Sequence, residues 1–472
     1  MLYQRVSSMW SNTVGKFINH VRPTYSQNLR PIIVSLSIFL LLYLIFLSFG
    51  FDYKTTAQNQ NQYQNDTISV PSLTDSKLKV ELVASNFTFL TNIEFLGKDD
   101  ILVLEKNTGN VYRIFHGNVT GPLIHIDVGY EDEQGLLGIA ASKPVHGNKN
   151  NIPVFLYYTQ CNDHDNKSSQ ECGNYVYRYK FEARNDRFTN RKLILSLPAL
   201  PGPSHNGGVL EIGKDNNLYL TIGDLQPSKF NQNSVFDTRA QNFINGTPPD
   251  GRGGILRVTQ EGKPVGQGIL GHKYPLNSYY AYGIRNSFGI GFDPINGNLW
   301  DTENGPRSGD EINLVEPGFN SGWDKVQGIW KFNEKGKKNG LFNESSEAPF
   351  VDFNGKGKYS KPEFVWDTTV GPTALIFFDS DKLGNEYKND IFVGSAKNQI
   401  FHFNLKENRK ALALSGNLTD LVDDKNDNSS KIIFGKNFGT ITDLEVGPDG
   451  YLYIVSGLRV EDEGSIYKIL PK

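Results

Sequence analysis

The feature that most constrains the fold of this chain is a short pattern that returns along most of its length. In each copy a turn rich in Gly, Asp and Asn precedes an alternating apolar strand, and further strands commonly stand on either side. Six copies occur at intervals of roughly fifty to ninety residues, near or above the lengths of known propeller repeats. The copies are GKDDILVLEKNTGNVYRI from Gly97, GNKNNIPVFLYYT from Gly147, GKDNNLYLTIGD from Gly213, DPINGNLWDTENG from Asp293, GNEYKNDIFVGSAKNQIFHF from Gly384 and GPDGYLYIVSG from Gly447.

A single unit of this kind leaves one apolar face exposed. Radial stacking of the units around a channel buries those faces and protects the strand edges. The composition agrees, because 47 glycines and 12% aromatic residues suit short strands joined by turns. We therefore predict an all-β fold, a six-bladed β-propeller over residues 76–472, with two stacked β-sandwiches as the alternative arrangement.

The N-terminal residues predict a membrane anchor. Residues 1–31 carry four Lys or Arg side chains and no acidic one, and residues 32–51 (IIVSLSIFLLLYLIFLSFGF) are uncharged and long enough to span a bilayer as a single transmembrane helix. The basic flank predicts a cytoplasmic N-terminus and an extracytoplasmic remainder in the cell membrane. Residues 52–75 are polar and without apolar periodicity, which predicts a flexible stalk. A cleaved secretory signal is the alternative, but an Ala-x-Ala-like cleavage site is missing.

Two features fit the extracytoplasmic location. Cys161 and Cys172 are the only cysteines and lie close together in one polar loop, so a disulfide is expected in an oxidising compartment, with two free thiols as the alternative. Sequons available for glycosylation occur at Asn65, Asn86, Asn118, Asn166, Asn245, Asn343, Asn417 and Asn428.

Polar side chains stand beside glycines at the ends of several predicted strands. They are Gln134 in EDEQGLLGIA, His205 and Asn206 in SHNGG, Asp224 in TIGD, Arg285 and Asn286 in YAYGIRNSFGIGF, the stretch TENGPRSGDEINLV, and Lys397 in VGSAKNQIFHF. Because equivalent strand ends of a propeller converge on the mouth of its channel, these residues are expected to line one pocket for a polar, anionic ligand. The formal net charge of −3, with both signs mixed along the chain, argues against a nucleic-acid partner.

Taken in order, these motifs resemble the quinoprotein glucose/sorbosone dehydrogenase family, which includes soluble PQQ-dependent glucose dehydrogenase and the aldose sugar dehydrogenases. The resemblance runs through EQGLLGIA, HNGGVLEIGKDNNLYLTIGD, YAYGIRNSFGIGFDPINGNLW, ENGPRSGDEINLVEPGFNSGW, IFVGSAKNQIFHF and ITDLEVGPDGYLYIVSG, and so covers nearly all of the chain beyond the stalk. The family fold is a six-bladed propeller, which agrees with the repeat pattern.

The resemblance implies a role for each candidate residue. His205 would be the general base that takes the proton from the anomeric hydroxyl of an aldose while hydride passes to the quinone, and Asp224 would orient it. Arg285 and Gln134 would stabilise the negative oxygen that develops on the quinone. The residues implied to contact PQQ are Gln134, Asn206, Arg285, Asn286 and Lys397. The main-chain carbonyls of Gly305 and Pro306 would bind Ca²⁺, supported by Asp310.

Three positions depart from the family pattern. Before the last DxxVGPDG-like motif the family usually has two arginines that grip PQQ, whereas this chain has Thr440 and Thr442. Each lost charged hydrogen bond is worth roughly 1.5–3 kcal/mol, so another cation must compensate, PQQ must bind weakly, or the ligand must differ. Lys436 and Arg459 are the basic residues nearby in sequence. Ser321 in GFNSGW replaces a common aromatic residue and is expected to alter the sugar cleft.

The sequence thus favours a membrane-anchored, extracytoplasmic, PQQ- and Ca²⁺-dependent dehydrogenase that oxidises aldoses to lactones. Its electron acceptor would be a membrane quinone or cytochrome. Two other classes remain open: a calcium-containing propeller hydrolase of lactonase type, and a non-catalytic surface propeller that binds glycans or proteins. The threonines at 440 and 442 favour the last, whereas an oriented His205–Asp224 pair favours the enzyme.

Overall fold

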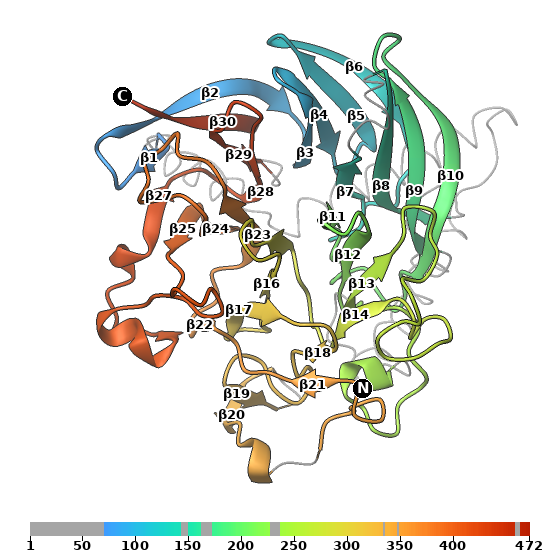
Figure 1. The fold of residues 1–472 in the computed structure, drawn as a ribbon, viewed down its shortest axis with the longest axis vertical. Coiled ribbons are helices and arrows are strands. Elements are labelled where there is room, and N and C mark those ends of the chain that lie inside the picture. The colour runs from blue at the N-terminus through green and yellow to red at the C-terminus, as the bar shows by residue number, and fades with distance from the viewer. Residues whose placement is uncertain are drawn as a thin grey trace, which may run out of the picture. The chain divides into compact units, whose positions relative to one another are not determined.

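A computed structural model describes residues 70–142, 150–161, 172–226, 237–333, 336–346, 349–457 and 463–472. Residues 70–472 form one compact unit. Its sheets follow one another around a common centre (Figure 1), and the predicted all-β propeller is confirmed. The predicted anchor, residues 32–51, lies outside the described residues, within which no helix is long and apolar enough to cross a membrane.

Within the described residues, six sheets of four to six strands and one two-stranded sheet make up this unit. The first contains β3 (Leu90–Gly97), β4 (Asp100–Glu105), β5 (Asn110–Phe115) and β6 (Asn118–His125), and the second contains β7 (Leu136–Ala141), β8 (Asn151–Cys161), β9 (Cys172–Glu182) and β10 (Arg187–Pro198). The third contains β11 (Leu210–Ile212), β12 (Leu218–Ile222), β13 (Gly254–Val258) and β14 (Tyr279–Tyr282), extended by β18 (Phe319–Asn320) and β21 (Lys358–Tyr359), which add in parallel.

The remaining three large sheets complete the ring. The fourth contains β15 (Gly289–Phe292), β16 (Leu299–Glu303), β17 (Asp310–Val315) and β22 (Phe364–Trp366), with β26 (Val422–Asp423) added in parallel. The fifth contains β23 (Pro372–Phe378), β24 (Asp390–Ser395), β25 (Gln399–Phe403) and β27 (Ile433–Lys436), and the sixth contains β28 (Ile441–Val446), β29 (Leu452–Ser456), β30 (Gly464–Pro471) and β2 (Leu78–Phe87). β2, from the beginning of the described chain, is the edge strand of the sixth sheet and pairs with β30, from the end of the chain.

Shorter elements sit in the connections. β19 (Trp330–Phe332) and β20 (Lys338–Leu341) form a two-stranded sheet in the long insertion after the fourth sheet's third strand. Short 3₁₀ helices are described at Arg239–Gln241, Glu344–Ser346, Gly416–Asp420 and Ser429–Lys431. β1 (Ser72–Leu73) pairs with β27, so the last residues of the expected stalk belong to a sheet of the propeller, because their backbone satisfies the open edge of β27.

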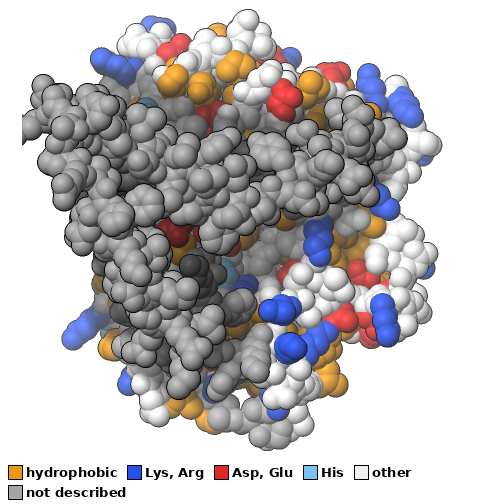
Figure 2. All heavy atoms as spheres, turned by 180° about the vertical axis from the view of Figure 1, so that it is seen from behind, with side chains coloured by type: hydrophobic (Ala, Val, Ile, Leu, Met, Phe, Trp, Pro, Cys, Tyr) orange, Lys and Arg blue, Asp and Glu red, His pale blue; other side chains and the backbone are white. Residues whose placement is uncertain are grey.

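The core lies between the sheets. An apolar cluster fills each of the six contacts between successive large sheets, including that between the sixth sheet and the first. The inner strands β3, β7, β11, β15, β23 and β28 surround the centre. On the surface seen in Figure 2, basic and acidic side chains are interspersed outside the grey atoms, as the mixed sequence charge predicts.

Candidate active site

His205 and Asp224 meet at one end of the third sheet. His205 precedes β11 and Asp224 follows β12, so the β11–β12 hairpin returns the aspartate to the histidine, with Nδ1 of His205 2.5 Å from Oδ1 of Asp224. Both side chains are buried. A carboxylate beside Nδ1 favours the tautomer with its proton on that nitrogen, which leaves the lone pair of Nε2 free to accept a proton.

Further contacts keep Asp224 ionised. Trp323 Nε1 donates to Oδ2 of Asp224 at 2.8 Å. Burial raises the pKa of Asp224, but the adjacent His205, the charge of Arg285 and the Trp323 bond together lower it below its ordinary value. Asp224 is therefore a fixed negative charge behind His205.

Glu133, in the loop before β7, forms a hydrogen bond with the loop that carries His205. Its Oε2 accepts a hydrogen bond from the backbone N–H of His205 at 2.6 Å and from Nδ2 of Asn286 at 3.0 Å. Ser204 donates to the neighbouring Asp132. The loop before β7 thus holds the loop that carries His205, and this bracing role of Glu133 was missed from the sequence. The only signal was its place beside Gln134 in the quoted EDEQG stretch.

Gln134, Arg285 and Asn286 are buried polar side chains with unused hydrogen-bonding atoms. Among the described residues, Nε2 of Gln134, Nε of Arg285 and Oδ1 of Asn286 have no partner. Nη1 of Arg285 donates to the carbonyl of Asn304 at 2.6 Å. Burial lowers the pKa of Arg285, against the opposing effects of Asp224 and the acids around it. Buried polar groups normally find partners, so these atoms mark where a ligand could bind.

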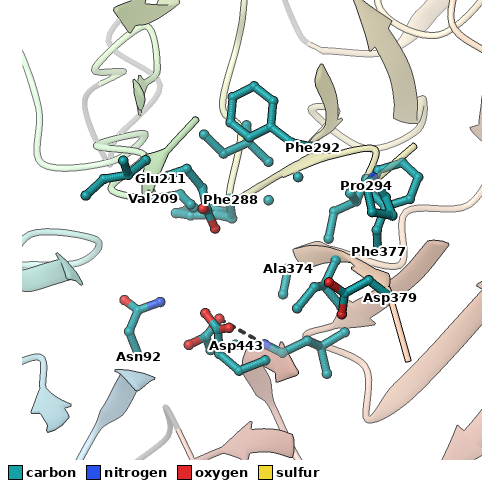
Figure 3. Close-up of a pocket in the computed structure, with 18 of the residues that line it drawn as sticks. Asn92, Val209, Glu211, Phe288, Phe292, Pro294, Ala374, Phe377, Asp379 and Asp443 are labelled. Carbon is teal, nitrogen blue, oxygen red and sulfur yellow. Dashed lines mark hydrogen bonds between the residues drawn. The ribbon is translucent and has the colours of Figure 1, made fainter. Parts of the chain in front are cut away.

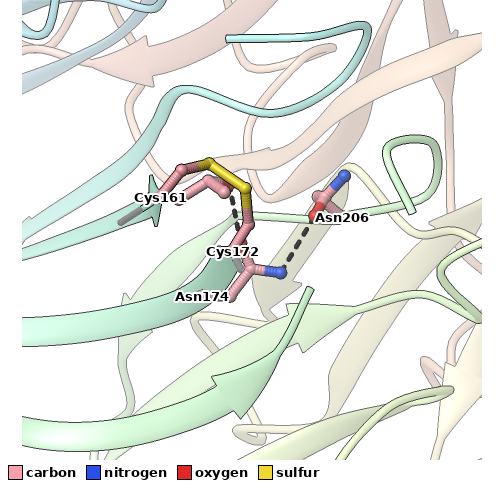
Figure 4. The surroundings of a disulfide bond; sticks show 5 residues. Cys161, Cys172, Asn174 and Asn206 are labelled. Atoms are coloured by element: carbon pink, nitrogen blue, oxygen red, sulfur yellow. Dashed lines mark hydrogen bonds between the residues drawn. A yellow bond between two sulfur atoms is a disulfide. The ribbon is translucent and has the colours of Figure 1, made fainter. Parts of the chain in front are cut away.

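Asn206 has a different environment from the one predicted. Its Nδ2 donates to the carbonyl of Pro203, and its Oδ1 accepts from Nδ2 of Asn174 at 2.9 Å. The predicted disulfide between Cys161 and Cys172 is present two residues from Asn174, where it joins facing residues of β8 and β9 (Figure 4). The side-chain N and O of Asn206 each make one hydrogen bond within the chain, and the side chain fixes the loop that carries His205.

Lys397 and the predicted calcium loop lie in the connections of the fourth and fifth sheets. Lys397 is exposed after β24, and its ammonium donates to the carbonyl of Thr369. Asp310 is buried and accepts backbone N–H groups of Gly305 at 2.8 Å, Val370 at 2.6 Å and Gly371 at 2.8 Å. Burial raises its pKa in spite of these three donors. Asp310 thus ties the Gly305–Pro306 loop to the loop before β23.

The predicted Ca²⁺ site would not be built from a cluster of side chains. Within the described ranges no group of three or more His, Cys, Asp or Glu is placed to hold a metal ion. The main-chain carbonyls predicted at Gly305 and Pro306 would need a site built mostly from backbone oxygens. Ser321, expected to alter the sugar cleft, is buried and donates to Oε2 of Glu303 at 2.6 Å. Oε1 of the same Glu303 accepts the backbone N–H of Arg285 at 2.8 Å.

Two connected cavities lie between the inner strands. One of about 380 Å³ is lined by Glu133, Lys106, Phe288 and Thr442 among others. A second of about 230 Å³ shares Asn92, Val209 and Phe288 with the first, and Figure 3 shows Glu211 and Asp443 at its edge. Burial, reinforced by Asp443, raises the pKa of Glu211 to about 8, and burial raises that of Asp443 to about 7. Neither cavity is lined by Gln134, His205, Arg285, Asn286 or Lys397, whereas Glu133, which accepts the backbone N–H of His205, lines the larger one.

The fold is a propeller in which an oriented histidine lies beside a cavity that Glu133, Lys106 and Thr442 line. The family profile described as glucose/sorbosone dehydrogenase matches residues 88–468, and the chain belongs to this family. It is therefore an enzyme, an oxidoreductase.

Several known proteins are similar to it. The aldose sugar dehydrogenase YliI of Escherichia coli is 24% identical over 60% of this chain and 64% of its own length. Quinoprotein glucose dehydrogenase B of Acinetobacter calcoaceticus is 33% identical over 48% of this chain and 46% of its own length. The matched region thus spans less than two thirds of each of these relatives. The PQQ-bound aldose sugar dehydrogenase of Streptomyces coelicolor has the same fold, with a TM-score of 0.57 and 20% identity over 85% of this chain and all of that one.

Proposed function

We propose that this protein is a membrane-anchored, PQQ-dependent aldose sugar dehydrogenase that oxidises the anomeric carbon of a sugar to a lactone. The observation that carries the proposal is the 2.5 Å contact of His205 with Asp224, beside a cavity of about 380 Å³ whose lining residues include Asn92 and Thr373, with an unpartnered Oδ1 and Oγ1. A binding scaffold has no need of an oriented base. Family membership and the names of the relatives support the substrate class and the cofactor.

The residues fit an anionic quinone cofactor. Arg285 Nε and Asn286 Oδ1 would hold it, and Lys397, whose ammonium donates to the carbonyl of Thr369, would meet its negative charge. When bound, PQQ supplies the acceptor for hydride from the sugar. Nε2 of His205 receives the proton of the anomeric hydroxyl, and Asp224 stabilises the imidazolium that results. The carbonyls of Gly305 and Pro306, with Asp310 behind them, would bind Ca²⁺.

The anchored, extracytoplasmic location is part of the proposal. It is supported by the apolar segment 32–51, the basic residues before it and the disulfide between Cys161 and Cys172. The asparagines of the described sequons are all exposed: Asn86, Asn118, Asn245, Asn343, Asn417 and Asn428. A membrane quinone or cytochrome would accept the electrons. Resistance of the protein to alkaline extraction of membranes, with protease digestion from outside the cell, tests this placement.

The blade number is also proposed. Each of the six large sheets would be one blade, as the repeat predicts, because an apolar cluster joins each sheet to the next around the ring. This arrangement brings the ends of the inner strands together, as the proposed site requires.

Dye reduction tests the activity. The full-length protein is loaded with PQQ and Ca²⁺ and supplied with a panel of aldoses, with His205→Ala measured alongside. Saturable reduction that depends on sugar and is lost in the variant is the expected result. A protein that binds no PQQ overturns the proposal, and the non-catalytic propeller suggested by Thr440 and Thr442 then becomes the better account.

A further inference from the structure

The larger cavity lacks the cations that the sequence pattern leads one to expect from the sixth sheet. Thr442 lines this cavity and donates to the carbonyl of Val455 at 3.5 Å, and Thr440 is buried. The nearby Lys436 is exposed on β27, where it pairs with β1, and Arg459 lies outside the described residues. The negative charge of an anionic ligand therefore has to be met from another direction.

Lys106 lines the same cavity from the turn between β4 and β5. It is only 6% exposed. Its ammonium donates to the backbone carbonyl of Asp132 at 2.7 Å and to Oδ1 of Asn107 at 2.9 Å, both neutral acceptors. Among the described residues no carboxylate lies within ion-pair distance of it. An ammonium carries three N–H donors, so one donor is left for a ligand. The carboxylates of Asp132 and Glu133, which line the same cavity, act on the charge of Lys106 from beyond ion-pair distance.

The free-energy cost of burying the Lys106 ammonium indicates a role in binding a ligand. A buried charge that no ion pair offsets destabilises the fold, and proteins commonly pair or remove it. Burial lowers the pKa of Lys106 to about 8, while Glu133 and Asp132 raise it. Lys397, by contrast, is exposed, and an exposed ammonium attracts an anion less strongly because water screens it.

We propose that Lys106 is the cationic contact for a carboxylate of the anionic cofactor in this cavity, in place of the charge that Thr440 and Thr442 do not supply. This inference rests on the proposed function and names the residue that makes cofactor binding possible in this chain. Lys106 acts as a binding residue, and His205 and Asp224 on the other side of Glu133 are not needed for this contact.

Binding of PQQ to the full-length protein, measured by equilibrium dialysis without sugar, tests the inference. Lys106→Met removes the charge and keeps most of the side-chain volume. Lys468→Met is the matched control, because it removes a partly buried lysine that lines neither cavity and is instead paired with Asp449. We expect Lys106→Met to raise the Kd about 10- to 100-fold, and Lys468→Met to leave it within about twofold.

Two further measurements test whether the effect of Lys106→Met depends on charge. The trimethyl ester of PQQ, which has no carboxylate charge, is expected to bind the wild type and Lys106→Met equally. Thr442→Arg placed in the Lys106→Met background is expected to restore binding of PQQ, since it returns a cation to the same cavity. Lys106→Gln replaces the Met variant if the latter does not fold.

The outcomes distinguish failure of the Lys106 contact from failure of the proposed dehydrogenase function. A Kd for PQQ that is the same in Lys106→Met, Lys468→Met and wild type overturns the role of Lys106 and leaves the proposed dehydrogenase standing. Loss of affinity that is equally large for the trimethyl ester also overturns it, because the effect would then not depend on charge. A wild-type protein that binds no PQQ overturns the proposed function and this inference with it.

Discussion

The candidate site has two sides. They differ in how completely the protein's own groups satisfy the hydrogen-bonding atoms and charges on each side. On the His205 side, formed by His205, Asp224 and Glu133, contacts of 2.5 and 2.6 Å fix the histidine before any ligand arrives. On the Thr442 side, formed by Thr442 and Lys106, a short hydroxyl faces a buried ammonium that has only neutral acceptors. The comparison teaches that the group proposed to move a proton is preorganised by the protein, whereas the charge proposed to bind the cofactor is left for the ligand to neutralise.

The largest expected effect is on the His205 side. His205→Gln keeps a polar side chain but removes the base, so kcat for dye reduction should fall about 10²–10⁴-fold. The Kd for PQQ should stay within about threefold, because the two sides are proposed to act separately. A large change in PQQ affinity with little change in kcat would reverse the assignment of the two sides.

A smaller loss is expected from Asp224→Asn. The amide keeps the size of the side chain but removes the charge that stabilises an imidazolium, so kcat should fall about 10²-fold while KM for sugar changes little. Steady-state kinetics with saturating PQQ check this. A change confined to KM would mean that Asp224 serves sugar binding and does not support the base.

Removal of the disulfide tests whether this crosslink helps to position His205. Replacing Cys161 and Cys172 by Ser removes a crosslink between residues that are 11 positions apart in the sequence. The free energy of unfolding should fall by about 2–3 kcal/mol. Activity at 25 °C should change less than about threefold, because the Asn174–Asn206 hydrogen bond holds the His205 loop separately. Urea unfolding and dye reduction measure the two effects, and a loss of activity larger than the loss of stability would show that the disulfide positions His205.

The smallest expected effect is a gain in stability on the Thr442 side. The folded-state pKa of Lys106, about 8, lies below that of an unfolded lysine, so the folded state is penalised wherever the ammonium stays protonated. Lys106→Met should therefore stabilise the PQQ-free protein by on the order of 1–3 kcal/mol at pH 7, and the gain should shrink between about pH 8 and 10. Urea unfolding at pH 7 and 10 checks the sign; destabilisation at pH 7 would show that Lys106 is satisfied without a ligand.

How far the sequence could predict this molecule depends on the kind of interaction. The turn and strand repeats predicted the propeller, because period-two burial and turn chemistry are local properties. The same local logic found the hairpin that returns Asp224 to His205. The roles of Glu133 and Asn206 depend on which loops meet across different sheets, and adjacent residues in EDEQG and SHNGG face different partners. Lys106 was overlooked because burial beside an empty space is a property of the folded ring.

A single-turnover experiment tests the central claim most directly. Wild-type protein and His205→Gln are each loaded with PQQ and Ca²⁺, mixed with an aldose without oxygen, and followed by the absorbance of the bound cofactor. The account predicts equal loading of both proteins and reduction that is at least about 10²-fold slower in the variant. Equal rates of reduction in the two proteins, or failure of the wild type to retain PQQ, would contradict it.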